Sequence, residues 1–128
     1  MAFYPSLRYT DARAAIDWLE QAFGFEPKAV HDNPDGSVGH AELVFGDGMI
    51  MFGSEPPGGD DRFGVRAGLG WSYVTVDADA IDALHDRAVA AGAEVVMELT
   101  DLDYGSRDFS ARDPEGNLWS FGTYRPPA

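Results

Sequence analysis

The sequence lacks cysteine, long apolar runs and an excess of basic residues. Without cysteine, neither a disulfide framework nor a thiolate metal site is available. No apolar run approaches the roughly 20 residues that a membrane-spanning helix needs. The opening residues, Met1-Ala2-Phe3-Tyr4-Pro5, also lack the basic and apolar regions of a signal peptide. These absences favour a cytoplasmic location.

Charge narrows the choice of partner. Lys and Arg number 9 and Asp and Glu number 22, which gives a formal net charge of −13. Such an acid excess argues against nucleic acid and anionic membranes as partners, because both repel a negatively charged surface. It favours a neutral or cationic small molecule. Alternatively, the acids form a solvated surface that serves solubility.

The 128 residues, 45% of them hydrophobic, suit one packed domain in which one order of elements occurs twice. Alternating apolar residues predict strands, helical spacing predicts helices, and Gly, Pro and Asp clusters predict turns. The first half predicts a strand at 3–9, a helix that Thr10 or Asp11 caps and Gly24 ends, and strands at 25–30, 37–45 and 49–52. The second half predicts a strand at 71–76, a helix that Asp77 or Asp79 caps and Gly92 ends, and strands at 93–99, 106–111 and 118–124.

Glycine spacing supports an internal repeat. Gly24 and Gly92, at the two helix ends, are 68 residues apart, and so are the hairpin residues Gly48 and Gly116. A fixed offset of this kind constrains the whole fold. We therefore predict a single α+β domain over residues 1–128 that consists of two tandem βαβββ modules. Module 1 spans about 1–54, a linker spans 55–69, and module 2 spans about 70–125.

Five local motifs carry a resemblance to a known family. They are Tyr-Thr-Asp-Ala at 9–12, Trp-Leu-Glu-Gln-Ala-Phe-Gly-Phe at 18–25, His-Ala-Glu-Leu at 40–43 with the hairpin at 46–48, Ala-Ala-Gly-Ala-Glu at 90–94 and Arg-Asp-Pro-Glu-Gly-Asn-Leu-Trp at 112–119. With them the chain resembles the vicinal oxygen chelate superfamily, which includes glyoxalase I, bleomycin resistance proteins and extradiol dioxygenases. The resemblance implies a curled mixed sheet around a cavity, helices on the outer face, and a cavity that is often completed in a homodimer.

The resemblance also implies where a metal would be bound. Metal-dependent members take His, Gln or Glu ligands from the first and fourth strands of each module. Those positions fall here on Tyr4, Phe52, Trp71 and Ser120. None of these is a usual ligand for a divalent ion, which prefers imidazole and carboxylate. We therefore expect neither metal nor another cofactor, as in the metal-free branch that resembles bleomycin resistance proteins.

Strand alternation sorts side chains onto two faces. The set expected under the helices is Leu7, Tyr9, Met49, Met51, Val74, Val76, Trp119 and Phe121. The set expected to face the cavity is Tyr4, Ser6, Arg8, Ile50, Phe52, Trp71, Tyr73, Thr75, Leu118 and Ser120. Aromatic walls suit flat ligands and attract cations. Alternatively, these aromatics fill the cavity or pack at a dimer interface.

Two further features offer charged or titratable groups. His40 and Glu42 are two residues apart on one predicted strand and so share a face, where they could act together in acid–base chemistry. Alternatively, the pair lies on a solvated or interface face. Arg107 follows Tyr104-Gly105-Ser106 near the expected cavity mouth. It would either hold a ligand carboxylate or pair with Asp103 or Asp108.

Three functional hypotheses follow. The first is a homodimeric small-molecule-binding protein that sequesters a cationic or aromatic ligand without metal. Its predicted ligand-binding residues are Tyr4, Ser6, His40, Glu42, Phe52, Trp71, Tyr73, Arg107 and Ser120. The second is a lyase or isomerase of the glyoxalase or dioxygenase type, with or without a metal, in which His40 and Glu42 are catalytic. The third is a non-catalytic interaction or regulatory domain.

Overall fold

The computed structural model describes residues 1–55 and 64–126, in which the order strand, helix, three strands occurs twice. Part of the predicted linker, residues 56–63, lies outside the described residues. The elements are β1 (Ser6–Tyr9), α1 (Ala12–Phe23), β2 (Glu26–Asp32), β3 (Val38–Phe45), β4 (Gly48–Ser54), β5 (Trp71–Thr75), α2 (Ile81–Ala90), β6 (Glu94–Asp101), β7 (Arg107–Arg112) and β8 (Leu118–Gly122). The predicted pair of βαβββ modules is confirmed.

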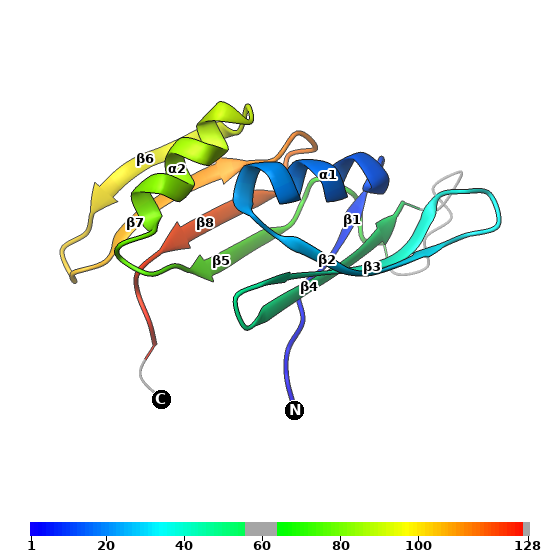
Figure 1. Cartoon of the computed structure of the whole chain (residues 1–128), viewed down its shortest axis with the longest axis horizontal. Helices are drawn as coiled ribbons and strands as arrows, with labels where there is room; N and C mark the ends of the chain where they lie inside the picture. Colours follow the sequence, from blue (N-terminus) through cyan, green and yellow to red (C-terminus); the bar gives the residue numbers. More distant parts are fainter. Residues whose placement is uncertain (56–63, 127–128) are drawn as a thin grey trace.

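Each module forms its own four-stranded sheet (Figure 1). The strand orders are β1-β4-β3-β2 and β5-β8-β7-β6. In both sheets the first strand runs parallel to the last, and the remaining pairs are antiparallel hairpins. The two sheets curl but do not close on each other. The predicted α+β class with mixed sheets is therefore correct.

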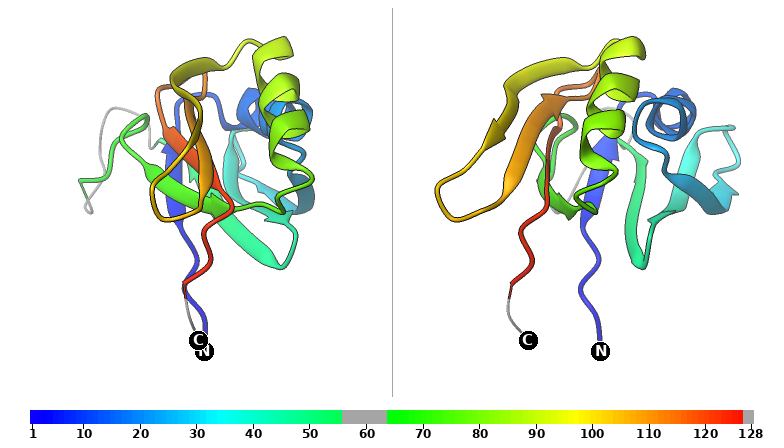
Figure 2. Two further views of the ribbon diagram at one scale, coloured as in Figure 1. Left: turned by 90° about the vertical axis from the view of Figure 1, so that its left-hand side faces the viewer. Right: turned by 60° about the vertical axis from the view of Figure 1, so that its left-hand side comes forward.

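The two helices lie side by side, and both chain ends leave the molecule in the same direction (Figures 1 and 2). The indole Nε1 of Trp18 in α1 donates to the carbonyl oxygen of Ala91, just after α2, at 2.9 Å. The Arg87 guanidinium in α2 donates to the carbonyl oxygens of Glu20 and Gln21 at 2.8 and 2.7 Å. These carbonyls lie in the last turn of α1, where partners within the helix run out. The Glu20 oxygen also accepts from Gly24 N at 3.1 Å, and Arg87 of the other helix adds to the hydrogen bonding at this end.

The hydrophobic core is shared by both modules. Phe23, at the end of α1, contacts Trp119 and Phe121 of β8, with ring centroids 5.8 and 4.7 Å apart. Phe109 of β7 stacks on Phe121 at 5.1 Å. Rings this large contribute most of the buried apolar area of a small core. The helix-facing sides of both sheets therefore merge into one interior.

A buried carboxylate joins the modules. Asp113, which follows β7 and is 4% exposed, accepts a 2.5 Å hydrogen bond from the Tyr9 hydroxyl of β1. Its same oxygen accepts from Trp119 Nε1 at 3.1 Å, and its other oxygen accepts from the backbone N–H groups of Glu115 and Asn117. A buried carboxylate is tolerated only when its oxygens are satisfied in this way.

A second carboxylate from the same loop adds to this connection between the modules. Glu115 accepts from the backbone N–H groups of Thr10 and Asp11 at 2.5 and 2.8 Å, at the turn that leads into α1. The loop between β7 and β8 thus holds both the end of β1 and the start of α1. The Asp-Pro-Glu-Gly segment at 113–116 links the two modules through side-chain hydrogen bonds.

Both ends of α1 were predicted correctly, whereas the predicted N-cap of α2 was wrong. Asp11 caps α1 by accepting from Ala14 N at 3.1 Å, and Gly24 ends it in the left-handed conformation with φ of 81°. In α2 the N-cap is Ala80, which makes no side-chain cap, so neither Asp77 nor Asp79 has the expected role. No helix in residues 1–55 and 64–126 is long and apolar enough to cross a membrane.

The predicted faces hold in the second sheet and fail in β4. Phe52 pairs with Leu7, and both are buried on the helix side; Ile50 is buried there as well. Met49 and Met51 are instead half-buried on the opposite side. The error arises at the hairpins, because β3 and β4 are joined by two residues and β7 and β8 by five. Gly48 and Gly116 are therefore not at equivalent positions of the two modules. Aligning β4 with β8 through these glycines displaces β4 by one residue, and a displacement of one residue exchanges the two faces of a strand.

Removing the Tyr9 hydroxyl tests how much its hydrogen bond to Asp113 contributes to stability. We expect Tyr9→Phe to lower the free energy of unfolding by about 1.5–3 kcal/mol in urea titrations, because the hydrogen bond is buried and its acceptor is charged. Tyr104→Phe is the control, since Tyr104 is 65% exposed, and we expect a change of no more than about 0.5 kcal/mol. Equal effects of the two changes would contradict the account.

The same substitution has a pH signature. Burial and the neighbouring Asp113 charge raise the pKa of Tyr9 well above its ordinary value of 10.0. The folded state keeps Tyr9 protonated while the unfolded chain ionises it, so this stability is complete below about pH 10 and falls as pH rises further. Above pH 10, we expect the free energy of unfolding to fall less steeply with pH in Tyr9→Phe than in the wild type. The difference in slope should be about 1.4 kcal/mol per pH unit.

Candidate functional site

The side of the second sheet that faces away from the helices presents aromatic and hydroxyl groups; we call it the β5/β8/β7 face. Trp71 and Tyr73 of β5 are 73% and 45% exposed. Tyr73 pairs with Ser120 of β8, and Ser120 pairs with Ser110 of β7, so these three side chains form a row across the sheet. Trp71, Tyr73 and Ser120 therefore lie on the face predicted for them.

A chain of hydrogen bonds runs over this face. Trp71 Nε1 donates to Ser120 Oγ at 3.0 Å, and Ser120 Oγ and Ser110 Oγ are 2.8 Å apart. Ser120 is 8% exposed, whereas Ser110 is only half-buried. The indole of Trp71 is therefore fixed along its nitrogen edge while the ring itself stays open to solvent.

The neighbouring row contains a buried carboxylate. Asp108 of β7 is 5% exposed, and the Tyr73 hydroxyl lies 3.3 and 3.5 Å from its two oxygens. Ser106, itself 3% exposed, also donates its hydroxyl to Asp108. Burial raises the pKa of Tyr73, and the negative charge of Asp108 adds to the rise. Tyr73 is thus held in its protonated form beside a carboxylate.

The sequence analysis missed Ser106, Asp108 and Ser110. A signal was present, because these residues alternate with Arg107, Phe109 and Ala111 along the predicted strand. Phe109 and Ala111 are in the core, which assigns the serines and Asp108 to the other side of the strand.

The first sheet presents the predicted histidine–carboxylate pair. His40 Nε2 and Glu42 Oε2 of β3 are 2.9 Å apart, with side chains 42% and 30% exposed. Ser6 of β1 pairs with Met51 of β4 on the same side. A shallow depression of about 290 Å³ is lined by Ser6, Arg8, His40, Met51 and Gly53 among others. The structure brings Ser6 and His40 together there and keeps Glu42 in contact with His40.

Two predicted site residues lie elsewhere. Phe52 is 3% exposed in the core, with its ring 4.8 Å from that of Tyr9, so its expected position on the cavity face is wrong. Tyr4 precedes β1, is half-exposed and belongs to neither sheet. The fourth-strand position of module 1 therefore falls next to Phe52, on Met51.

With Met51 in place of Phe52, the four positions that bind metal in the resemblance still hold no usual metal-binding side chain. Met51 has a thioether, Trp71 and Ser120 lie where they were predicted, and Tyr4 lies just before β1. None of the four offers imidazole or carboxylate. Among the described residues, nowhere do three or more His, Asp or Glu side chains gather as they would around a metal ion. The chain's own residues thus do not fit the divalent metal of the metal-dependent relatives, and no chemical step is derived through one.

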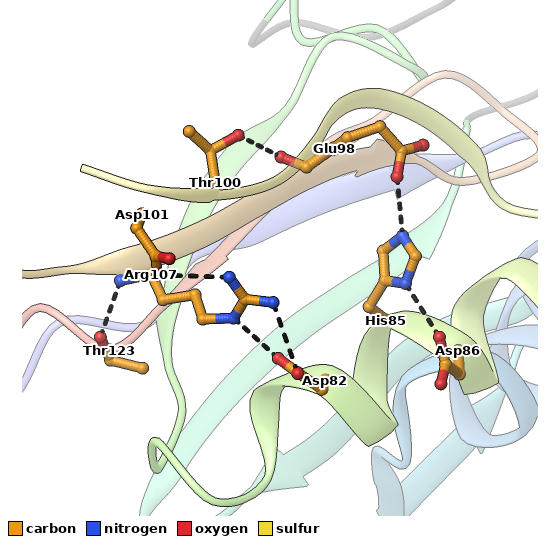
Figure 3. Close-up of polar contacts among 8 residues, drawn as sticks. All are labelled: Asp82, His85, Asp86, Glu98, Thr100, Asp101, Arg107 and Thr123. Carbon is orange, nitrogen blue, oxygen red and sulfur yellow. Dashed lines mark hydrogen bonds and ion pairs between the residues drawn. The ribbon is translucent and has the colours of Figure 1, made fainter.

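Arg107 is engaged away from the β5/β8/β7 face (Figure 3). Its guanidinium donates to Asp82 of α2 at 2.8 Å and to Asp101 of β6 at 3.2 Å. Hydrogen bonding to Asp82 and Asp101 raises the pKa of Arg107. The hydrogen bond from Arg107 in turn lowers the pKa of Asp82. The expectation of an ion pair was right in kind, but its partners are Asp82 and Asp101 rather than Asp103 or Asp108.

His85 of α2 joins the helix to β6 (Figure 3). Its two ring nitrogens lie 3.1 Å from Asp86 and 3.1 Å from Glu98, and its ring packs edge-on against Phe109 at 5.2 Å. The contact with Phe109 places His85 on the core side of β7, opposite Asp108 and Ser110.

A groove of about 610 Å³ separates the two modules beside β5. Its walls include Phe25, Phe45, Met49 and Val74, and Tyr73 also borders it. Tyr73 therefore lies where this groove meets the β5/β8/β7 face.

Comparison with known proteins agrees with this architecture. The model of the Glyoxalase/Bleomycin resistance protein/Dioxygenase superfamily matches residues 3–121. An uncharacterised protein of Mycobacterium bovis is 34% identical over 126 residues, covering 94% of this chain and 82% of its own length.

Two solved structures share this fold at different levels of sequence identity. The crystal structure of TioX from Micromonospora sp. ML1 matches with a TM-score of 0.77 and 32% identity, covering 97% of this chain and 100% of TioX. The fosfomycin resistance protein FosX of Mesorhizobium loti matches with a TM-score of 0.67 but only 11% identity, over 98% of this chain and 92% of FosX. The second match shows the fold alone.

Proposed function

The chain belongs to the Glyoxalase/Bleomycin resistance protein/Dioxygenase superfamily, and on that premise we propose that it is a metal-free small-molecule-binding protein. It holds a flat, aromatic and cationic ligand by stoichiometric sequestration, without turnover. The residues assigned to binding are Trp71, Tyr73, Ser110 and Ser120 on the second sheet, with Ser6, His40 and Glu42 on the first. Nucleic acid and membrane are not partners in this proposal.

One observation carries the proposal: Trp71 and Tyr73 are exposed side by side on a sheet whose polar groups are already satisfied. Exposed aromatic rings backed by a rigid surface suit stacking against a flat ligand. The electron-rich ring faces favour a cation, and so does the net charge of −13.

We further propose that a second copy of the chain completes the site. β5 and β1 each lie at one edge of their sheet, with a strand partner on one side only within the described residues. An open edge beside exposed aromatics is a surface that another strand or sheet covers readily. In the dimer, the β5/β8/β7 face of one chain would meet the first sheet of the other, which places His40 and Glu42 opposite Trp71 and Tyr73.

The proposal predicts ligand-dependent stabilisation without metal. Untagged protein purified without chelator should contain less than about 0.1 divalent metal per chain, because tight sites of this family purify occupied. The flat cation 9-aminoacridine should raise the melting temperature by several degrees at saturation. The flat anion naphthalene-2-sulfonate should not.

Two variants test whether the stabilisation by 9-aminoacridine depends on Trp71. Trp71→Ala should abolish most of the stabilisation by 9-aminoacridine. Arg107→Gln should leave it unchanged, because Arg107 is held by Asp82 and Asp101. Near one metal per chain, or no response to either probe, would contradict the proposal.

A second candidate function rests on the contact between His40 and Glu42. A carboxylate 2.9 Å from an imidazole orients the ring and makes it a candidate general base on a carbonyl substrate, as in an isomerase or lyase. Screening of small carbonyl compounds should then reveal a turnover that falls at least about 100-fold in His40→Ala. Activity that survives this change intact would exclude the role.

A further inference from the structure

Residues 1–5 form an arm that leaves the body of the molecule before β1 begins (Figures 1 and 2). Met1 and Phe3 are fully exposed, and Tyr4 is half-exposed. Pro5, at the root of the arm, has no backbone N–H, so the arm is a poor continuation of the pairing between β1 and β4. Three large side chains with apolar surfaces therefore project into solvent, outside the core of their own chain.

A groove with buried apolar walls begins at the root of this arm. It has a volume of about 610 Å³, and Phe3 and Pro5 border it. Its deep walls include Phe25, Ile50 and Val76, which are only 2–5% exposed. A cavity of this size accommodates a ligand or several side chains. An exposed apolar arm and an open apolar groove thus lie at the same end of the molecule.

One side of the groove is the open edge of β5. Residues 72–76 line it one after another, as expected where the edge of a strand borders a cavity. The Gly70 carbonyl and the Val76 N–H bond to β8, and backbone groups point to alternate sides along a strand. Those of Tyr73 and Thr75 therefore point toward the groove, where no other strand of the described residues pairs with them.

We propose that residues 1–5 of a second copy of the chain enter this groove and add a strand to the edge of β5. The exchange is reciprocal, and it places the partner's Tyr4 on the β5/β8/β7 face. This inference rests on the proposed function, whose aromatic site it completes. A segment added to an open sheet edge gains main-chain hydrogen bonds along its length. Five extended residues span about 16 Å, and β5 also has five residues.

Strand alternation determines which side chains of the arm enter the groove. Val74 and Val76 of the β5 segment face the apolar interior, whereas Tyr73 faces the other side. The fully apolar ring of the partner's Phe3 belongs on the interior side. Neighbouring residues of a strand point to opposite sides, so the partner's Tyr4 then lies beside Tyr73. The exchange gives Tyr4, predicted to bind ligand, a place in the aromatic site.

Charge and symmetry are both compatible with the exchange. Asp47 and Asp77 border the groove, and Asp77 is paired with Arg125 at 2.7 Å. The first acidic residue of the chain is Asp11, so the arm brings no negative side chain to this acidic rim. Because every copy has both an arm and a groove, one two-fold axis fills both grooves at once.

Introduced cysteines test the contact, because the chain has none of its own. Tyr4→Cys protein is mixed with Tyr73→Cys or Thr75→Cys protein and oxidised, and the products are identified by mass. We expect a covalent heterodimer with at least one of the two, since side chains opposite each other on paired strands lie within reach of a disulfide. Thr100→Cys, on β6 at the opposite edge of the same sheet, is the control and should give none.

Sedimentation equilibrium measures the contribution of the arm to dimerisation. Phe3→Ser should raise the dimer dissociation constant at least about 100-fold, because each dimer buries two Phe3 rings. Val89→Ser, which removes a half-exposed apolar side chain from α2, should change it by less than about threefold. Circular dichroism and melting temperature confirm that each variant is folded.

Calorimetry with 9-aminoacridine tests whether the partner's Tyr4 belongs to the ligand site. Tyr4→Ala should raise the dissociation constant of 9-aminoacridine at least about fivefold through loss of one aromatic contact. Tyr104→Ala, at another exposed tyrosine, should leave it within about twofold of the wild-type value.

The outcomes separate this inference from the proposed function. A wild-type monomer, a disulfide that forms only within one chain of a Tyr4→Cys/Tyr73→Cys double variant, or equal effects of Phe3→Ser and Val89→Ser overturns the exchange and leaves the aromatic site of β5 standing. Cross-linking by protein that does not bind 9-aminoacridine overturns the proposed function and the ligand role of the partner's Tyr4, while the exchange stands.

Discussion

The arrangement of this molecule depends on the buried carboxylate of Asp113. It receives hydrogen bonds from Tyr9 in the first module and from Trp119 and two backbone N–H groups in the second. A half-satisfied carboxylate at this depth would be strongly unfavourable, so the modules are held in the relative position that completes it. That position merges the helix-facing sides of both sheets into one core and leaves their other sides outside.

The proposed function rests on the side chains that the two sheets present on their faces turned away from the helices. On the second sheet this face carries two exposed aromatics whose polar atoms are fixed by hydroxyls and a carboxylate. Trp71, Ser120 and Met51 offer neither imidazole nor carboxylate. The proposed binding function instead rests on the exposed rings of Trp71 and Tyr73.

Sequence reasoning succeeded where one residue fixes one local structure. Asp11 caps a helix and Gly24 ends it by adopting positive φ. The repeated order of strand, helix and three strands then predicts the two modules. It failed for Phe52 because the faces of a strand depend on hairpin length, and the two hairpins differ by three residues. Asp108 was missed for another reason: its importance comes from Tyr73 and Ser106, which reach it only in the folded sheet.

Three indole groups offer the most direct test of where the ligand binds. Trp71 Nε1 lies on the β5/β8/β7 face, Trp18 Nε1 between the helices and Trp119 Nε1 in the core at Asp113. In ¹⁵N-labelled protein, assigned with Trp71→Phe, titration with 9-aminoacridine should shift the Trp71 indole resonance in a saturable way and leave the other two in place. Saturable shifts of Trp18 or Trp119 with Trp71 unmoved would show that the ligand site lies elsewhere in the molecule.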